Sequence, residues 1–267
     1  MPYIKTIWIA GNTIEVAKTY SARYGRKIAR GPNQNKTPEA VKRYNAKVAE
    51  RELRLLINEN FGYKDYHVTL TYRKEERPEP ETAKKQLSRF FGKLRRAYRK
   101  AGKELRWISA TEYKRTAIHH HVIINRHDIG LIADAWPYGR PKIVQLDNTG
   151  DYAALAAYLI KETSKTFGEP DSPNKKRWRA SRNLRKPKVK KQVIHAEHWA
   201  DDPKPVKGYR IVRDSVYMDV SPVTGYPYQW YRMIRPPDRK GNGGAQNTAG
   251  SDAGEARAGK GETEKGC

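Results

Sequence analysis

The stretch TEYKRTAIHHHVIIN, residues 111–125, predicts the β-hairpin around which the rest of the fold is arranged. Aromatic and β-branched residues enrich two runs, 104–113 and 118–125, on either side of the short connection KRTA. If KRTA closes a symmetric hairpin, Tyr113 pairs with Ile118, and every pair farther from the turn follows from that register. The register therefore also determines which side chains share a face of the sheet.

Three consecutive histidines, His119, His120 and His121, lie in the second of these strands. Side chains alternate between the faces of a strand, so His119 and His121 share one face and His120 lies on the other. The predicted register places Glu112 opposite His119. Two imidazoles and a carboxylate on one face could hold a divalent cation and leave positions open for substrate oxygens. The alternative is a surface histidine cluster that binds no metal.

The elements around the hairpin predict an α+β fold. A strand at 66–72 and an amphipathic helix at 79–102 precede the hairpin, and a short helix (128–136), a strand (141–147) and a helix (150–165) follow it. This order is that of a ferredoxin-like (RRM-like) antiparallel sheet with helices on one face. The other face of such a sheet would be free for a ligand.

Composition divides the chain into five segments. They are an N-terminal hairpin and loop (1–36), a central α+β domain (37–166), a basic segment (167–191), an accessory β-rich element (192–236) and a tail (237–267). The tail consists mainly of Gly, Ala and charged residues, without aromatic or branched aliphatic side chains. Such a composition cannot bury a core, so we expect the tail to be disordered.

The charge of the chain indicates its partner. It has 54 Lys and Arg against 29 Asp and Glu, a net charge of +25 over 267 residues. Nucleic acid is the first candidate, because contacts with phosphates release counterions. No run approaches the roughly 20 apolar residues that span a bilayer, so we expect no membrane partner and a cytoplasmic location. Cys267 is the only cysteine, which argues against a cysteine-ligated zinc site and favours Mn²⁺ or Mg²⁺.

An alanine-rich segment, DYAALAAYLIKE (151–162), carries a candidate nucleophile. Tyr158 is surrounded by small residues, and Lys161 lies three positions on, hence on the same face of the helix. A neighbouring ammonium favours the phenolate or steadies a pentacovalent phosphorus. Tyr152 lies six residues earlier, about 120° away around the helix, and cannot share this line of attack. The alternative is a tyrosine that packs against the sheet with its hydroxyl at the rim.

In this order, the motifs HVTLTY (67–72), TEY with HHHVII (111–124) and YLIK (158–161) resemble those of HUH endonucleases. The resemblance is to the replication-associated proteins that initiate rolling-circle replication of small phages, plasmids and mobile elements. It covers about residues 64–166, and SRNLRKP (181–187) is similar to a segment of the phage-type members. The central domain would then be an HUH catalytic domain.

The resemblance implies a role for each candidate residue. Glu112, His119 and His121 would bind the metal, Tyr158 would be the nucleophile and Lys161 its companion. The sequence departs from the family pattern at two positions. His120 stands where the family usually has an apolar residue, and Ala154 stands where some members have a second tyrosine. The second departure favours a single-tyrosine mechanism.

The implied reaction is the nicking of single-stranded or cruciform origin DNA in a bacterial host cell. Tyr158 would keep the 5′ phosphate as a phosphotyrosine and release a 3′ hydroxyl that primes synthesis. A later strand transfer would rejoin the ends. A helicase and a polymerase of the host would be the further partners.

The basic segment would hold DNA through its phosphates, with a tryptophan able to stack on a base. The residues expected to bind DNA are Lys175, Lys176, Arg177, Trp178, Arg179, Arg182 and Arg185. Two other classes stay open. One is a non-enzymatic sheet that binds RNA or DNA. The other is the same chemistry in a single-tyrosine transposase or a conjugative relaxase.

Overall fold

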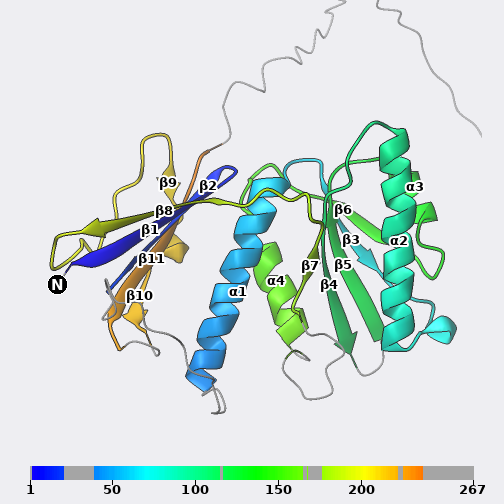
Figure 1. The fold of residues 1–267 in the computed structure, drawn as a ribbon, viewed down its shortest axis with the longest axis horizontal. Coiled ribbons are helices and arrows are strands. Elements are labelled where there is room, and N and C mark those ends of the chain that lie inside the picture. The colour runs from blue at the N-terminus through cyan, green and yellow to red at the C-terminus, as the bar shows by residue number, and fades with distance from the viewer. Residues whose placement is uncertain are drawn as a thin grey trace, which may run out of the picture. The chain divides into compact units, whose positions relative to one another are not determined.

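The computed structural model is an α+β arrangement of two antiparallel sheets and the helices that pack on them (Figure 1). It describes residues 2–20, 39–114, 117–164, 167, 176–221 and 225–236. The expected α+β class is confirmed. In these described residues, no helix is both long and apolar enough to cross a membrane. The predicted tail lies outside the described residues.

The predicted hairpin lies within a five-stranded sheet. β4 (Trp107–Lys114) pairs with β5 (Ala117–Ile124) in the predicted register. The sheet order is β6-β3-β5-β4-β7, with β3 at Tyr66–Leu70, β6 at Lys142–Gln145 and β7 at Arg179–Ala180. β5 is therefore inserted between β3 and β4, which are consecutive strands in the chain.

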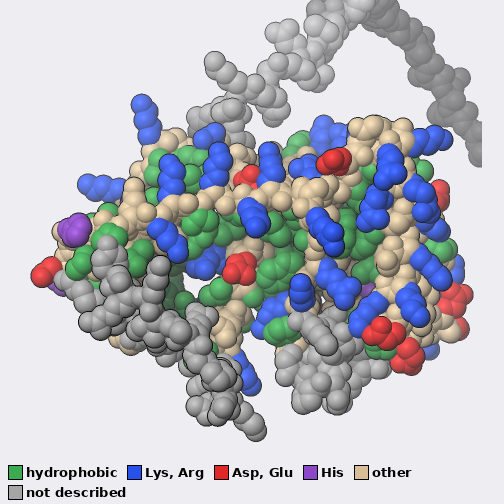
Figure 2. Space-filling model, in the orientation of Figure 1, with side chains coloured by type: hydrophobic (Ala, Val, Ile, Leu, Met, Phe, Trp, Pro, Cys, Tyr) green, Lys and Arg blue, Asp and Glu red, His purple; other side chains and the backbone are tan. Residues whose placement is uncertain are grey.

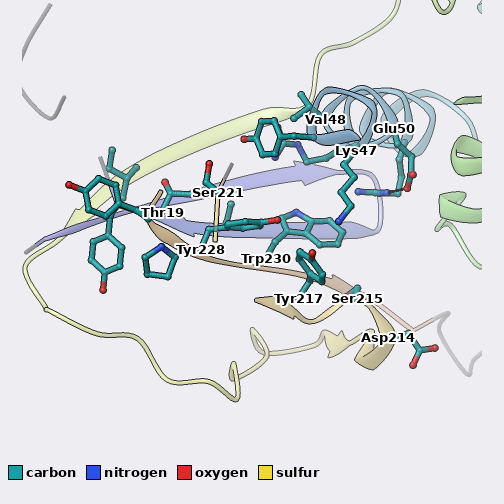
Figure 3. Close-up of a pocket in the computed structure, with 18 residues that line it drawn as sticks. Thr19, Lys47, Val48, Glu50, Asp214, Ser215, Tyr217, Ser221, Tyr228 and Trp230 are labelled. Atoms are coloured by element: carbon teal, nitrogen blue, oxygen red, sulfur yellow. Dashed lines mark hydrogen bonds and ion pairs between the residues drawn. The ribbon is translucent and has the colours of Figure 1, made fainter. Parts of the chain in front are cut away.

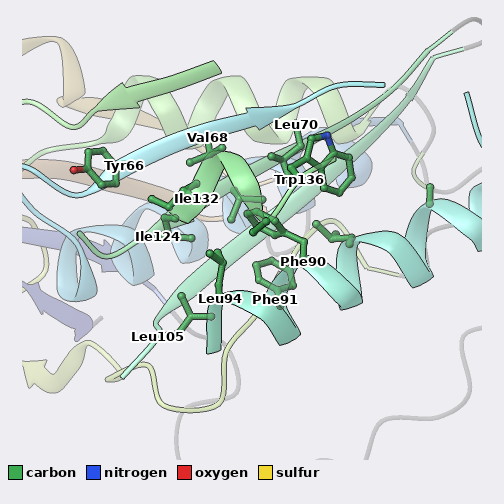
Figure 4. Close-up of a cluster of buried hydrophobic side chains, with 14 of the residues drawn as sticks. Tyr66, Val68, Leu70, Phe90, Phe91, Leu94, Leu105, Ile124, Ile132 and Trp136 are labelled. Atoms are coloured by element: carbon green, nitrogen blue, oxygen red, sulfur yellow. The ribbon is translucent and has the colours of Figure 1, made fainter. Parts of the chain in front are cut away.

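Helices cover both faces of this sheet, so the expectation of helices on one face is wrong. α2 (Pro80–Lys100) and the short α3 (Ile129–Asp134) pack on one face, and Figure 4 shows the core that they bury. α1 (Glu39–Asn60) and α4 (Ala153–Ser164) supply residues to a second core on the opposite face.

The strand sequences explain why both faces are covered. In β5, Val122 and Ile124 belong to the core under α2, whereas Ile123 belongs to the core under α1 and α4. All three side chains are fully buried. Strands that are apolar at successive positions have to be shielded from water on both sides.

The N-terminal hairpin and the C-terminal β-rich element, predicted as separate segments, form one six-stranded sheet. β1 (Tyr3–Ala10) pairs with both β2 (Thr13–Thr19) and β8 (Lys188–Ile194), and β2 also pairs with β11 (Pro227–Ile234). β9 and β10, at Arg210–Ile211 and Tyr217–Val220, pair with β11. The described helical segments also include two 3₁₀ turns, at Lys74–Glu76 and Arg213–Ser215.

Polar contacts from α1 connect the six-stranded sheet to α4. Arg54 Nε lies 2.7 Å from Glu15 Oε1 on β2, and both side chains are buried. Removing one partner of such a pair would leave an uncompensated buried charge, so the contact holds α1 against β2. Asn58 donates to Thr13 Oγ1 at 3.1 Å and accepts from the backbone N–H of Tyr152 at 3.0 Å. α1 therefore sets where α4 begins.

A cleft of about 530 Å³ lies between α1 and the six-stranded sheet (Figure 3). Tyr217, Tyr228 and Trp230 line it from β10 and β11, and Lys47 Nζ lies 4.2 Å from the Tyr217 ring centroid. None of the predicted site residues lines this cleft. The candidate site is instead built on the five-stranded sheet.

Candidate functional site

The register of β4 and β5 brings the predicted metal-binding residues to one face of the sheet. Glu112 lies opposite His119, and Ala110 lies opposite His121, as the symmetric hairpin predicts. This is the face that α1 and α4 cover, because Ala110 belongs to their core. Glu112 and His121 are buried, and His119 is partly exposed.

The middle histidine, His120, belongs to the opposite face and is part of the folding core. Its Nε2 lies 2.9 Å from the Tyr72 hydroxyl and its Nδ1 lies 2.9 Å from Thr111 Oγ1. The edge of Trp136 packs against its ring, with the centroids 5.6 Å apart. Burial lowers the pKa of His120 to about 3. With both ring nitrogens engaged in hydrogen bonds, His120 is a structural residue, which explains why a polar side chain is tolerated at this core position.

His121 has one ring nitrogen without a hydrogen bond in the described segments of the chain. This nitrogen, Nε2, is buried and lies 3.9 Å from Glu112 Oε2, which is too far for a hydrogen bond. Its Nδ1 lies 3.3 Å from Nε2 of His67 on β3. Burial lowers the pKa of both His67 and His121 to about 4. Both imidazoles are therefore neutral near pH 7, the state in which histidine binds a cation.

The three predicted metal ligands do not surround a common position. In the part of the chain that the structure describes, no three His, Cys, Asp or Glu side chains are grouped so that they could hold a metal ion. The donor types nevertheless suit a divalent cation, because the unsatisfied Nε2 of His121 faces the Glu112 carboxylate. His119 shares their face through the strand register.

Helix α4 presents the candidate nucleophile to this histidine face. The Tyr158 side chain is 43% exposed, and its ring meets that of His121 edge-on, with centroids 5.2 Å apart and planes at 88°. Lys161 is exposed on the same helix. The phenol, the imidazole and the Glu112 carboxylate thus lie side by side.

Tyr152 has a different environment. It immediately precedes α4, is buried, and donates its hydroxyl hydrogen to the backbone oxygen of Asp147 at 2.9 Å. Burial raises the pKa of Tyr152 well above that of free tyrosine, with the Asp147 carboxylate adding to the shift. Both effects oppose formation of the phenolate, so this tyrosine is poorly suited to nucleophilic attack.

The sequence interpretation missed two residues of this site. His67 contacts His121 from β3, and the buried Glu162 on α4 raises the pKa of His121 against the larger effect of burial. His67 alternates with buried Val68 along β3, which indicates its face, but only the pairing of Thr69 with His121 shows that it reaches the site. Glu162 lies four residues after Tyr158, and this helical spacing could have indicated it.

Of the predicted DNA-binding residues, four line clefts beside α2, two have partners within the protein, and Lys175 lies outside the described residues. Lys176, Arg179 and Arg182 line clefts beside α2. Trp178 is half-buried against the core under α1 and α4, and also lines one of these clefts.

Two arginines of the set have partners within the protein. The Arg177 guanidinium lies over the Phe167 ring, 4.2 Å from its centroid. Arg185 Nη2 donates to the backbone oxygen of Glu59 at 3.0 Å, and its Nε lies 3.5 Å from the Glu59 carboxylate. These contacts connect the segment to the end of α4 and the end of α1.

Comparison with known proteins identifies the segment that carries the site. Residues 65–167 match the family of the replication-associated protein ORF2/G2P. This segment contains β3, α2, β4, β5, α3, β6 and α4, and therefore all the catalytic and metal-site candidates. The resemblance to replication-associated proteins is confirmed at this level, and such a family suggests an endonuclease-type replication initiator. Neither the curated proteins nor the solved structures contain a match to the chain.

Proposed function

We propose that the protein initiates rolling-circle replication by nicking single-stranded or cruciform origin DNA, with Tyr158 as the nucleophile. The observation that carries this proposal is the contact between the exposed Tyr158 ring and His121, beside Glu112. The family match supports a role in replication. The strand order β6-β3-β5-β4 supports it further, because it is the order expected of the ferredoxin-like sheet of HUH endonucleases.

The reaction would be a transesterification. Tyr158 Oη attacks a DNA phosphorus, the bond from phosphorus to the 3′ oxygen breaks, and the 5′ phosphate stays on the tyrosine. The leaving 3′ oxygen takes up a proton and becomes the hydroxyl that primes synthesis. Attack by a 3′ hydroxyl on the phosphotyrosine reverses the step and rejoins strands, so no ATP is consumed.

The other residues of the site would orient and neutralise the phosphate. Lys161, one turn after Tyr158, would contact its oxygens. Glu112, His119 and His121 would hold Mn²⁺ or Mg²⁺, which supplies Lewis-acid polarisation of the scissile phosphate when bound. His67, through its contact with Nδ1 of His121, would fix the orientation of that imidazole.

The test is a covalent-adduct assay on a labelled library of single-stranded oligonucleotides with Mn²⁺. Wild type, Tyr158→Phe and Tyr152→Phe are compared on a denaturing gel. We expect a covalent protein–DNA band that requires the metal, survives in Tyr152→Phe and disappears in Tyr158→Phe.

Other outcomes reject the proposal in distinguishable ways. A band that disappears in Tyr152→Phe alone would assign the nucleophile to the buried tyrosine. No band with any oligonucleotide, together with retained DNA or RNA binding, would favour the non-enzymatic binding protein.

A further inference from the structure

Two adjoining clefts, of about 750 and 160 Å³, follow the edge of the five-stranded sheet where α2 faces β4 and β7. Both are lined by Arg95 and Trp107, so together they form one groove, called here the α2 groove. It lies on the face of the sheet that packs on α2, opposite the face of His121 and Tyr158. Its residues are not part of the candidate nicking site.

The α2 groove is strongly basic on both of its walls. Lys84, Arg95, Arg99 and Lys103 line it from α2 and the turn that follows, and Lys176, Arg179 and Arg182 line it from the segment around β7. Among the described lining residues, Glu104 is the single acidic one. α2 as a whole contains eight basic residues and one acidic residue, and Figure 2 shows Lys and Arg side chains gathered over this helix. Such a groove attracts a polyanion.

Aromatic side chains are interleaved with this charge. The partly exposed Trp107 stacks on Phe91, which is buried in the core, with ring centroids 3.9 Å apart and planes at 16°. Phe91 therefore holds the Trp107 ring in place, and Trp178 and Tyr113 line the same cleft. Flat rings between cations are the usual surface for single-stranded nucleic acid, because bases stack on the rings while phosphates contact the cations. A duplex, whose bases are already stacked, gains little from such rings.

Tyr113 provides an independent indication of a ligand. Its hydroxyl is buried, and no group among the described residues makes a hydrogen bond with it. A buried hydroxyl without a partner costs free energy that a hydrogen bond from a bound ligand would recover.

We propose that the α2 groove binds single-stranded DNA on the face of the sheet opposite the nicking site. The choice of DNA over RNA rests on the proposed function, whereas the groove itself is argued from its charge, its rings and Tyr113. Trp178 both packs on the α4 side of the sheet and lines the groove. Trp178 therefore lies where the groove approaches the α4 side of the sheet.

The experiment measures the affinity of a labelled single-stranded oligonucleotide by fluorescence anisotropy between about 50 and 200 mM salt. All proteins carry Tyr158→Phe, so that nicking does not interfere. The groove variant adds Arg95→Ala, Arg99→Ala and Arg182→Ala. The matched control adds Lys204→Ala, Lys207→Ala and Arg213→Ala, which remove the same charge from exposed positions near the six-stranded sheet.

Each phosphate contact contributes about 0.7 to the slope of log affinity against log salt for a single strand. We expect the groove variant to lose about 2 from this slope and at least about tenfold in affinity near 0.1 M salt. The control should change much less. An equal loss of affinity in both variants would show that only net charge matters and would overturn the proposal. Tighter binding of a duplex of the same sequence would overturn it as well.

Tyr113→Phe is the second, sharper variant. Because the hydroxyl has no hydrogen-bond partner in the described part of the chain, its removal should leave the melting temperature unchanged or slightly raised. DNA affinity should fall several-fold with no change in the salt slope. An unchanged affinity would remove Tyr113 from the groove's contacts and count against the proposal.

The two proposals fail separately. If no covalent band forms with any oligonucleotide but the groove variant loses affinity, the nicking function is wrong and the groove stands. If the band forms but the groove variant binds as its control does, the groove is wrong and the nicking function stands. RNA preferred over DNA by the groove would overturn the choice of ligand.

Discussion

The two faces of the five-stranded sheet use the same residue type in opposite ways. On the α2 face, His120 is locked between Tyr72 and Thr111 and has both ring nitrogens engaged. On the α4 face, His121 keeps one buried nitrogen that has no hydrogen-bond partner among the described residues, and its ring lies against the exposed Tyr158. Adjacent histidines in such a motif therefore have to be assigned roles separately for each face of the sheet. The hydrogen bonds of His120 explain its place in the core, whereas the free nitrogen of His121 requires an explanation, which a bound cation would supply.

The largest expected effect comes from substitution of His121, on the α4 face. His121→Gln keeps a polar side chain of similar length but removes an imidazole beside Tyr158. We expect covalent-adduct formation to fall by about 10³-fold, the loss typical of a group that stabilises a transition state directly. The melting temperature should change by only a few degrees. An adduct yield near that of wild type would contradict the role of this face in catalysis.

The neighbouring substitution, His120→Ala, should act on stability instead. It leaves a cavity beside Trp136 and removes the partner of the buried Tyr72 hydroxyl. We expect the free energy of unfolding to fall by about 3 kcal/mol, measured by urea denaturation. His195→Ala, at an exposed position, is the control and should change it by less than about 0.5 kcal/mol. If His120→Ala were stable but inactive, His120 would have the catalytic role that is assigned here to His121.

Both faces contribute to the pH dependence of stability. Burial holds the pKa of His67 and His121 at about 4 and that of His120 at about 3, below the value of 6.5 for a free histidine. The unfolded chain therefore binds protons that the folded protein does not. The stabilisation is present above pH 6.5 and is lost as the pH falls toward 4.

Between pH 7 and pH 5, each of these histidines should cost on the order of 2 kcal/mol of unfolding free energy. Denaturation at several pH values measures the loss. His120→Phe, which cannot take up a proton, should flatten the pH profile, whereas His198→Ala, at an exposed position, should not. A His120→Phe protein with the wild-type profile would contradict the assignment of His120.

The smallest effect is expected at Tyr152, which serves as a comparison with Tyr158. Tyr152→Phe removes the hydrogen bond to the Asp147 backbone oxygen and should cost about 1 kcal/mol of stability. Adduct formation should stay within about twofold of wild type, because the phenol of Tyr152 is buried away from solvent. Thermal melts and the adduct assay give the two values. A stronger effect on adduct formation than on stability would show that this phenol takes part in the reaction.

The features that depend on local geometry could be predicted from the order of the residues. The KRTA connection sets the pairing of Tyr113 with Ile118, and strand alternation then places Glu112, His119 and His121 on one face. The α+β class and the N-terminal hairpin follow from periodicity in the same way. These features were predictable because each depends on residues that are close in the chain.

The features that depend on contacts between residues distant in the chain could be seen only in the tertiary structure. The placement of His67 beside His121 requires β3 to pair with β5, and the union of β1 and β2 with β8 and β11 joins the two ends of the described chain. Tyr152 is buried in the core that α1 and α4 share, and its backbone N–H donates to Asn58, which is distant in the chain. The apolar run of β5 implies that both faces are covered, but which helices cover each face depends on how α1, α2 and α4 pack. Such contacts are selected by the total free energy of packing, which no local pattern of residues encodes.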